Sequence, residues 1–205
     1  MAQITTGIRA ALSLPWVYDS FQRIAGVRRS RTILVSEHIR PRPGDRVLDI
    51  GCGTGTLLEY LPETVEYVGF DASAEYIEAA RHRFGNRGQF VNQLLDQTAV
   101  EELHGFDRVT ATGILHHLDD DEVLHLFRVA KGAMVDDGEF HSLDPCFCVN
   151  QSAISRFLVS RDRGQNVREP AAYRDLALRV FNRVELTHRN DMRTIPYDNA
   201  ILRCY

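Results

Sequence analysis

One short segment limits the folds open to this chain more than any other part of the sequence. Residues 47–55 read Val-Leu-Asp-Ile-Gly-Cys-Gly-Thr-Gly, so an apolar run leads directly into three alternating glycines. A short apolar run is typical of a buried strand. Glycines permit a tight turn and let a ligand approach the backbone beside the N–H groups that open a helix. The segment therefore predicts a strand, a ligand-binding turn and a helix, with a tight turn that binds nothing as the alternative.

The rest of the chain alternates between strand-like and helix-like patterns. Apolar runs that predict strands lie at residues 46–50, 67–70, 89–91, 106–111, 139–143, 183–187 and 200–204. Helical spacing and helix-start signals predict helices at residues 56–61, 73–84, 98–103, 120–135 and 171–180. Such alternation predicts an α/β fold with a doubly wound, mostly parallel sheet and helices on both faces.

The glycine spacing separates two classes of nucleotide ligand. Dinucleotide sites use G-x-G-x-x-G, in which the second glycine admits a pyrophosphate. Here Thr56 takes the last position and the glycines follow G-x-G-x-G, which disfavours a nicotinamide-dependent oxidoreductase. Asp71 ends the next predicted strand, where a carboxylate can accept hydrogen bonds from both hydroxyls of a ribose. Loop and carboxylate together predict an adenosine site without a pyrophosphate.

Three segments carry a family resemblance. Residues 47–55, 67–72 and 106–118 resemble the successive motifs of class I S-adenosylmethionine-dependent methyltransferases. Leu115-His116-His117-Leu118 is similar to the branch that includes ubiquinone and menaquinone biosynthesis methyltransferases. The resemblance covers about residues 45–145 and implies the family's Rossmann-like, seven-stranded sheet with an antiparallel last strand. It also implies S-adenosyl-L-methionine as the cofactor and transfer of its methyl group to a small-molecule acceptor, with oxygen as the expected acceptor atom.

The resemblance places the cofactor against residues that follow successive strands. Asp71 would bind the ribose, Ala72 the adenine, and the first two loop glycines the methionine part. The expected cofactor-binding residues are Tyr18, Asp49, Gly51, Cys52, Gly53, Gly55, Asp71, Ala72, Leu94, Leu95, Thr112 and Gly113. Two departures from the family pattern stand out: Leu94 replaces an acidic residue, and Asp136-Asp137-Gly138-Glu139 replaces a proline–glycine–glycine turn.

Two adjacent histidines are the catalytic candidates. His116 and His117 follow the fourth predicted strand, at the end of the sheet where ligands bind in such folds. A hydroxyl acceptor must lose its proton, so one histidine could act as the base or orient the acceptor. The alternative is that both cap the next helix. The polar, arginine-rich residues 144–169 either recognise the acceptor or form a solvated lid.

The size of the chain favours one domain. Its 205 residues form one methyltransferase domain in this interpretation. We expect an N-terminal helical cap over residues 1–43, a cofactor-binding core over 44–145, and an acceptor-side segment with the last strands over 146–205. A cofactor-binding scaffold or regulator that transfers no methyl group is the alternative to an enzyme.

Composition limits the partners. The net charge of −4 provides no basic field for a nucleic acid. We find neither a signal-peptide pattern nor an apolar run near the roughly 20 residues that span a bilayer. A cytoplasmic protein is therefore expected, although peripheral membrane contact through the N-terminal helices stays open and the oligomeric state is not addressed. No metal site is expected, because Cys146 and Cys148 lack a second cysteine pair.

Overall fold

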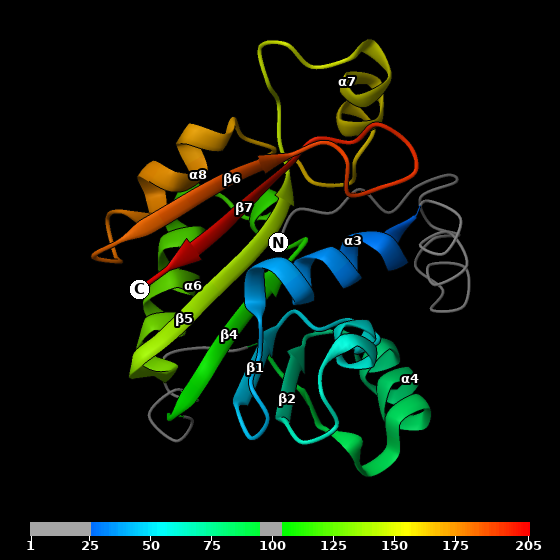
Figure 1. The fold of residues 1–205 in the computed structure, drawn as a ribbon, viewed down its shortest axis with the longest axis vertical. Helices are drawn as coiled ribbons and strands as arrows, with labels where there is room; N and C mark the ends of the chain where they lie inside the picture. Colours follow the sequence, from blue (N-terminus) through cyan, green and yellow to red (C-terminus); the bar gives the residue numbers. More distant parts are fainter. Residues whose placement is uncertain (1–25, 95–103) are drawn as a thin grey trace.

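The computed structural model describes residues 26–94 and 104–205. Within these ranges the strands form one seven-stranded sheet of order β3-β2-β1-β4-β5-β7-β6 (Figure 1). The strands are β1 (Arg46–Ile50), β2 (Glu66–Asp71), β3 (Gln89–Asn92), β4 (Phe106–Thr112), β5 (Met134–Pro145), β6 (Val184–Arg189) and β7 (Asn199–Cys204). Strands β1 to β5 pair in parallel, whereas β7 runs antiparallel to both β5 and β6. The predicted fold class is confirmed, including the antiparallel last strand.

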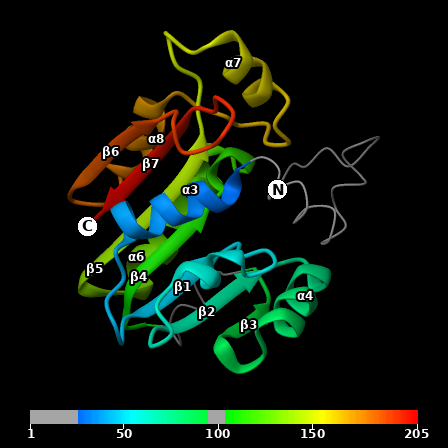
Figure 2. The same cartoon turned by 45° about the vertical axis from the view of Figure 1, so that its right-hand side comes forward.

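Helices cover both faces of the sheet. They are α3 (Val27–Ile33), α4 (Ala74–Phe84), α6 (Asp120–Ala133), α7 (Ala153–Ser160) and α8 (Pro170–Ala177), joined by the shorter helical turns η1 (Leu34–Ile39), η2 (Thr56–Tyr60), η3 (Gly85–Arg87) and η4 (Leu115–His117). Figures 1 and 2 show α3 on one side of the sheet and α6 with α8 on the other. The core is accordingly split into two apolar clusters. One contains buried residues of α6 and α8, the other those of η1 and α4.

Local sequence explains where the two longest helices begin. The Oγ atom of Ser73 accepts the backbone N–H of Tyr76 at 3.3 Å, which caps α4 as predicted. Helix α6 starts with a capping box, in which Asp119 and Glu122 each accept the other's backbone N–H. Helix α6 ends at Ala133 rather than at residue 135, because Met134 already has extended backbone and opens β5.

Several other elements also differ from the form that the sequence predicts. Residues 56–60 form a 3₁₀ turn instead of a regular helix, and η1 is π-helical. Strand β5 begins at Met134 instead of residue 139, and its register with β4 shifts between Phe106 and Arg108. The expected turn is therefore a bulge inside a strand. Gly138 permits it, since a Cβ there would lie 3.0 Å from the carbonyl oxygens of Phe106 and Val135.

The remaining predictions concern segments outside the described residues and the possibility of a membrane span. Tyr18, Leu95 and the helix predicted at residues 98–103 lie outside the described ranges. None of the helices in residues 26–94 and 104–205 combines the length and the apolar character needed to cross a bilayer. Helix α7 and its flanking loops lie beyond the carboxyl end of β5, beside the loop that joins β6 to β7 (Figure 1).

Candidate functional site

The glycine loop has left-handed backbone at all three glycines. The φ angles are 70° at Gly51, 56° at Gly53 and 71° at Gly55, a region that side chains rarely permit. A Cβ at Gly51 would collide with the side chain of Ile114, and one at Gly55 would lie 2.7 Å from the ring of Phe90. A Cβ at Gly53 would meet nothing within 4 Å. Only the middle glycine of the loop therefore leaves its face open to a ligand.

The loop's backbone donors are used within the protein. The N–H groups of Gly51 and Cys52 both donate to the carbonyl of Phe70, at 2.8 and 2.9 Å. Gly55 donates to the carbonyl of Cys52 at 3.0 Å, and Gly53 donates to the Asp71 carboxylate at 2.9 Å. We expected free N–H groups to meet the ligand. At these four residues the loop instead offers a close-lying backbone surface.

Asp71 joins the end of β2 to the glycine loop. Its second carboxylate oxygen accepts the backbone N–H of Ser73 at 2.8 Å, and the residue is half-buried. An ionised carboxylate has about four acceptor positions. Two of them hold the backbone, so the carboxylate retains capacity for a pair of ligand hydroxyls.

The other half-buried or exposed candidates follow the neighbouring strands. Ala72 is exposed after β2, and the Leu94 side chain is 60% exposed after β3. Thr112 and Gly113 are half-buried at the end of β4. The N–H of Gly113 donates to the carbonyl of Leu143 at 2.8 Å, and Thr112 Oγ1 accepts from Arg31 at 2.5 Å. The glycine loop and these residues therefore lie at one edge of the sheet, where strands β1 to β4 end.

The side chains of two predicted cofactor residues face the protein interior. Asp49 is 2% exposed and accepts hydrogen bonds from the Tyr67 hydroxyl at 2.7 Å and from Thr110 Oγ1 at 2.8 Å. Burial raises the pKa of the Asp49 carboxyl, and these two hydrogen bonds oppose the rise. The Cys52 thiol packs against Gly69 of β2, and burial raises its pKa as well. Both side chains therefore stabilise the loop from within the protein interior.

His116 lies between two carboxylates. Its Nδ1 is 2.8 Å from an Asp144 oxygen at the end of β5, and its Nε2 is 3.0 Å from an Asp162 oxygen after α7. Burial alone would lower the pKa of His116, but the hydrogen bonds to Asp144 and Asp162 outweigh it and raise the pKa to about 9. At neutral pH His116 is therefore a buried cation with both ring nitrogens occupied.

His117 has the opposite character. Its ring centroid lies 4.1 Å from that of His116. Burial, reinforced by the charge of His116, lowers the pKa of His117 to about 4, so its ring is uncharged at neutral pH. Its buried Nδ1 has no hydrogen-bond partner within the described part of the chain. The adjacent histidines therefore divide into a fixed cation and an uncharged ring with a nitrogen left available.

The segment after α7 packs against the turn η4, which carries His116 and His117. A Cβ at Gly164 would collide with the ring of His116, and Asn166 donates its N–H to the His116 carbonyl at 2.9 Å. Arg168 donates to the carbonyls of Leu115 and Leu118, at 2.9 and 2.8 Å, and to Asp120 at 2.7 Å. Arg168 is therefore a clamp on the turn rather than an exposed group that could grip an acceptor.

Among residues 26–94 and 104–205, two groups of side chains come close enough to share a metal ion. One is His116, His117 and Asp162, whose central histidine is already bonded on both nitrogens. The other is Cys146, Cys148 and His188. The spacing of Cys146 and Cys148 alone predicted no metal site, and His188 lies forty positions beyond Cys148 in the sequence. Only the order of the strands could have indicated this cluster, because β5 and β6 both end at this edge of the sheet.

Comparison with known proteins is consistent with this geometry. Residues 48–140 match the model of a family described as "Methyltransferase domain". Trans-aconitate 2-methyltransferase of Pseudomonas aeruginosa is 33% identical over 115 residues, which are 55% of this chain and 41% of the relative. Ubiquinone biosynthesis O-methyltransferase of Vibrio cholerae is 35% identical over 81 residues, 38% of this chain and 33% of the relative.

Cyclopropane-fatty-acyl-phospholipid synthase of Escherichia coli is 30% identical over 120 residues, 57% of this chain and 30% of that relative. The chain thus aligns with less than half the length of each of these curated relatives.

Solved structures share the fold at low sequence identity. A SAM-dependent methyltransferase from Archaeoglobus fulgidus superposes with a TM-score of 0.71 at 19% identity, over 92% of this chain and 99% of that chain. Human N-acetylserotonin methyltransferase, solved in complex with SAM, gives a TM-score of 0.70 at 16% identity, over 94% of this chain and 55% of that chain. In its matched domain, its related sequences and its strand order, the chain is similar to class I S-adenosylmethionine-dependent methyltransferases.

Proposed function

We propose that the protein binds S-adenosyl-L-methionine at the edge formed by the ends of β1 to β4 and transfers its methyl group to an oxygen of a small molecule. The observation that carries the proposal is the pairing of the open face of Gly53 with the Asp71 carboxylate, which lies 2.9 Å from the Gly53 nitrogen. A backbone surface beside a carboxylate with spare acceptor capacity fits an adenosine-containing ligand that lacks a pyrophosphate.

The residues around this pair fit the parts of the cofactor. Asp71 would accept the ribose hydroxyls, and the exposed side chains of Ala72 and Leu94 would cover the adenine. Gly53 and the end of β4 would lie against the methionine part. The Leu94 side chain, which is exposed after β3, would remove apolar surface from water if it covered the adenine ring.

The cofactor supplies an electrophilic methyl group, and the protein has to hold the acceptor and accept its proton. We assign the role of base to uncharged His117, whose ring would accept the hydroxyl proton as the oxygen gains the methyl group. His116 stays cationic between its two carboxylates. It is a positioning residue that fixes the neighbouring ring and favours negative charge on the acceptor oxygen.

The names of the relatives support oxygen as the acceptor atom without deciding it. The Vibrio cholerae relative is an O-methyltransferase, whereas the Escherichia coli relative is a cyclopropane-fatty-acyl-phospholipid synthase. A hydroxyl acceptor loses its proton on methylation, which is the role proposed for His117.

Calorimetric titration with S-adenosylmethionine tests the cofactor site. Asp71→Asn should weaken binding about 10-fold or more, because hydrogen bonds to a charged acceptor contribute about 1.5 to 3 kcal/mol. Asp107→Asn is the matched control, since Asp107 also accepts a backbone N–H, that of Arg46 at 2.8 Å, but at the start of β4. Wild-type protein that binds no S-adenosylmethionine would refute the proposal.

Release of S-adenosylhomocysteine with a panel of phenols and hydroxy acids tests the transfer step. His117→Ala should lower turnover about 100-fold or more and leave cofactor affinity unchanged, whereas His125→Ala, an exposed histidine of α6, should change neither. Equal loss of turnover and cofactor affinity in His117→Ala would assign it a structural role. Tight cofactor binding without turnover on any acceptor of the panel would favour the scaffold alternative.

A further inference from the structure

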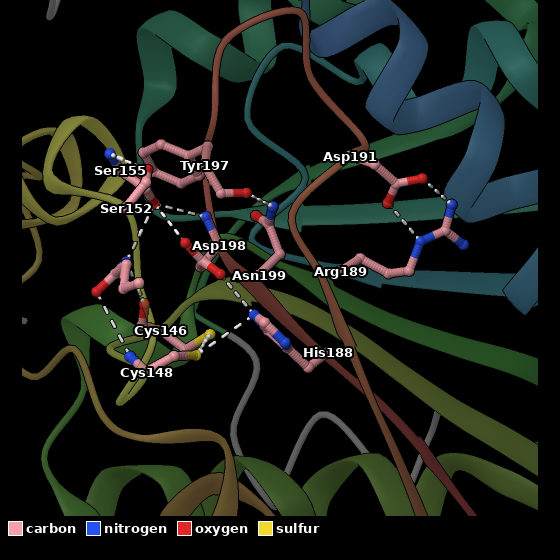
Figure 3. A network of polar contacts seen from close by, with 11 residues as sticks. Cys146, Cys148, Ser152, Ser155, His188, Arg189, Asp191, Tyr197, Asp198 and Asn199 are labelled. Atoms are coloured by element: carbon pink, nitrogen blue, oxygen red, sulfur yellow. Dashed lines mark hydrogen bonds and ion pairs between the residues drawn. The ribbon is translucent and has the colours of Figure 1, made fainter.

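Three metal-ligating side chains meet at the carboxyl edge of β5 and β6. Cys146 and Cys148 follow β5, and His188 lies near the end of β6, forty residues further along the chain (Figure 3). The Sγ atoms of the two cysteines are 3.7 Å apart, and Cys148 Sγ is 3.3 Å from His188 Nε2. All three ligand atoms lie within 4.8 Å of one another. Neither the proposed cofactor site nor the transfer step uses these residues.

We propose that Cys146, Cys148 and His188 bind a zinc ion as its three protein ligands. Tetrahedral zinc with bonds of about 2.3 Å to sulfur and 2.0 to 2.1 Å to nitrogen separates two sulfurs by about 3.8 Å, and sulfur from nitrogen by about 3.5 Å. The observed separations of 3.7 and 3.3 Å therefore match this arrangement. Two thiolates and an imidazole also favour zinc over calcium or magnesium, which prefer oxygen ligands.

Asp198 holds the histidine of the site in place. Its Oδ1 is 2.6 Å from His188 Nε2, and the residue is only 3% exposed. Its Oδ2 accepts the Ser155 hydroxyl at 2.6 Å, which fixes the carboxylate and leaves Oδ1 facing the histidine (Figure 3). Zinc would displace the proton that His188 Nε2 shares with Asp198. Binding also releases one proton from each of the two thiols, so zinc affinity should rise with pH.

A second layer of hydrogen bonds orients the ligands. The side-chain amide of Gln151 donates to the Cys146 carbonyl at 3.2 Å and to the Ser155 hydroxyl at 3.1 Å, and its oxygen accepts the Cys148 N–H at 3.4 Å. Cys146 also donates its own N–H to the Asp198 carbonyl at 3.1 Å. Partners of this kind fix the orientation of metal ligands. The ion would then tie the end of β5 to β6 and to the start of α7.

Cobalt titration of protein stripped of metal with a chelator tests the site. One equivalent of Co²⁺ should produce a thiolate-to-cobalt charge-transfer band and the visible absorption of a tetrahedral ion, and one equivalent of Zn²⁺ should remove both. Outer-layer substitutions typically weaken metal binding by about 10- to 100-fold. Loss of a ligand in Cys148→Ser or His188→Ala should therefore weaken zinc binding by more than about 100-fold.

Matched controls keep the test specific. Cys204→Ser removes a buried thiol of β7 outside the cluster, and His125→Ala removes an exposed imidazole of α6. Both should bind zinc as the wild type does, and far-ultraviolet circular dichroism should show that all four variants are folded. Zinc should raise the melting temperature of the wild type and both controls but not of the ligand variants.

Three results would overturn the proposal. The first is the absence of a thiolate–cobalt band in folded, reduced protein, and the second is a band of full intensity that survives in Cys148→Ser. The third is a Cys146–Cys148 disulfide that forms in air equally fast with and without zinc, which would mark a redox pair instead. None of these readouts needs S-adenosylmethionine, so failure of the metal site would leave the proposed methyl transfer standing, and the reverse holds too.

Discussion

At the scale of single residues, the three loop glycines meet two different physical demands. Gly51 and Gly55 are closely packed, since side chains of Ile114 and Phe90 occupy the space that a Cβ would need. Gly53 has the same left-handed backbone but faces open space. A substitution at Gly53 therefore distinguishes the cost of left-handed backbone from the need for space beside a ligand.

Gly53→Ala should weaken S-adenosylmethionine binding well beyond its effect on stability. Left-handed backbone costs an alanine about 1 to 2 kcal/mol. Gly44→Ala should lower the free energy of unfolding by a similar amount, because Gly44 has a φ of 88° and a Cβ there would meet nothing within 4 Å. Gly44 lies in the turn before β1, so its variant should keep wild-type cofactor affinity. Denaturant unfolding and calorimetric titration of both variants provide the comparison, and equal affinities would count against a ligand at Gly53.

The role of a single residue could be predicted from the sequence where that residue belongs to a recognisable motif. The glycines and Asp71 belong to a short pattern, and the structure places Asp71 2.9 Å from the Gly53 nitrogen. The difference between His116 and His117 was out of reach, because it depends on Asp144 and Asp162, which lie 28 and 46 positions beyond His116. The sequence could only offer both histidines as candidates.

At the scale of elements, the short turn η4 depends on a distant segment for its shape. Its carbonyls point toward Arg168, whose side chain is 11% exposed and donates to Leu115, Leu118 and Asp120. Because one guanidinium satisfies groups at both ends of the turn, it sets the position of the two histidines between them.

Arg168→Ala should lower stability by about 2 to 4 kcal/mol, since it leaves buried carbonyls without a donor. It should also lower turnover more than it lowers cofactor affinity, because the glycine loop does not contact Arg168. Arg168→Lys should not restore either property, as an ammonium lacks the planar fork that reaches three acceptors. The control Arg174→Ala removes an exposed pair with Asp175 and should cost less than about 0.5 kcal/mol. Thermal unfolding and steady-state turnover measure both effects, and identical results for the two alanine variants would exclude the clamp.

Elements were predicted well where local rules decide them. Strand β1 coincides with the predicted residues, and Ser73 caps α4 because its hydroxyl reaches a backbone N–H three positions ahead. The π-helical turn η1 and the bulge in β5 were missed. The bulge depends on pairing with a strand distant in sequence, as the closeness of Gly138 to the Phe106 carbonyl illustrates, and local propensity carries no information about such pairing.

At the scale of the whole molecule, the carboxyl edge of the sheet gathers residues from the full length of the described chain. Strand order brings the ends of β5 and β6 together on either side of the antiparallel β7. The Cys146, Cys148 and His188 cluster follows from this pairing. Single-sequence patterns show each strand separately, so the cluster could not be predicted until the order of β6 and β7 was known.

His116 links three segments that are distant in sequence, so its protonation bears on global stability. Its pKa is raised from an ordinary value near 6.5 to about 9 by Asp144 and Asp162 against the effect of burial. A histidine whose pKa is raised on folding stabilises the folded state fully below its unfolded pKa. This contribution should decline as the pH rises from about 6.5 through 9, because the folded protein then loses a proton that the unfolded chain has already released.

Urea unfolding of the wild type and His116→Gln between pH 6 and 10 measures this contribution. The difference in free energy of unfolding between the two proteins should be largest near pH 6 and should shrink steadily toward pH 10. His125→Gln should follow the wild type throughout, since His125 is exposed on α6. A difference that stays constant with pH would mean that His116 is uncharged in the folded protein.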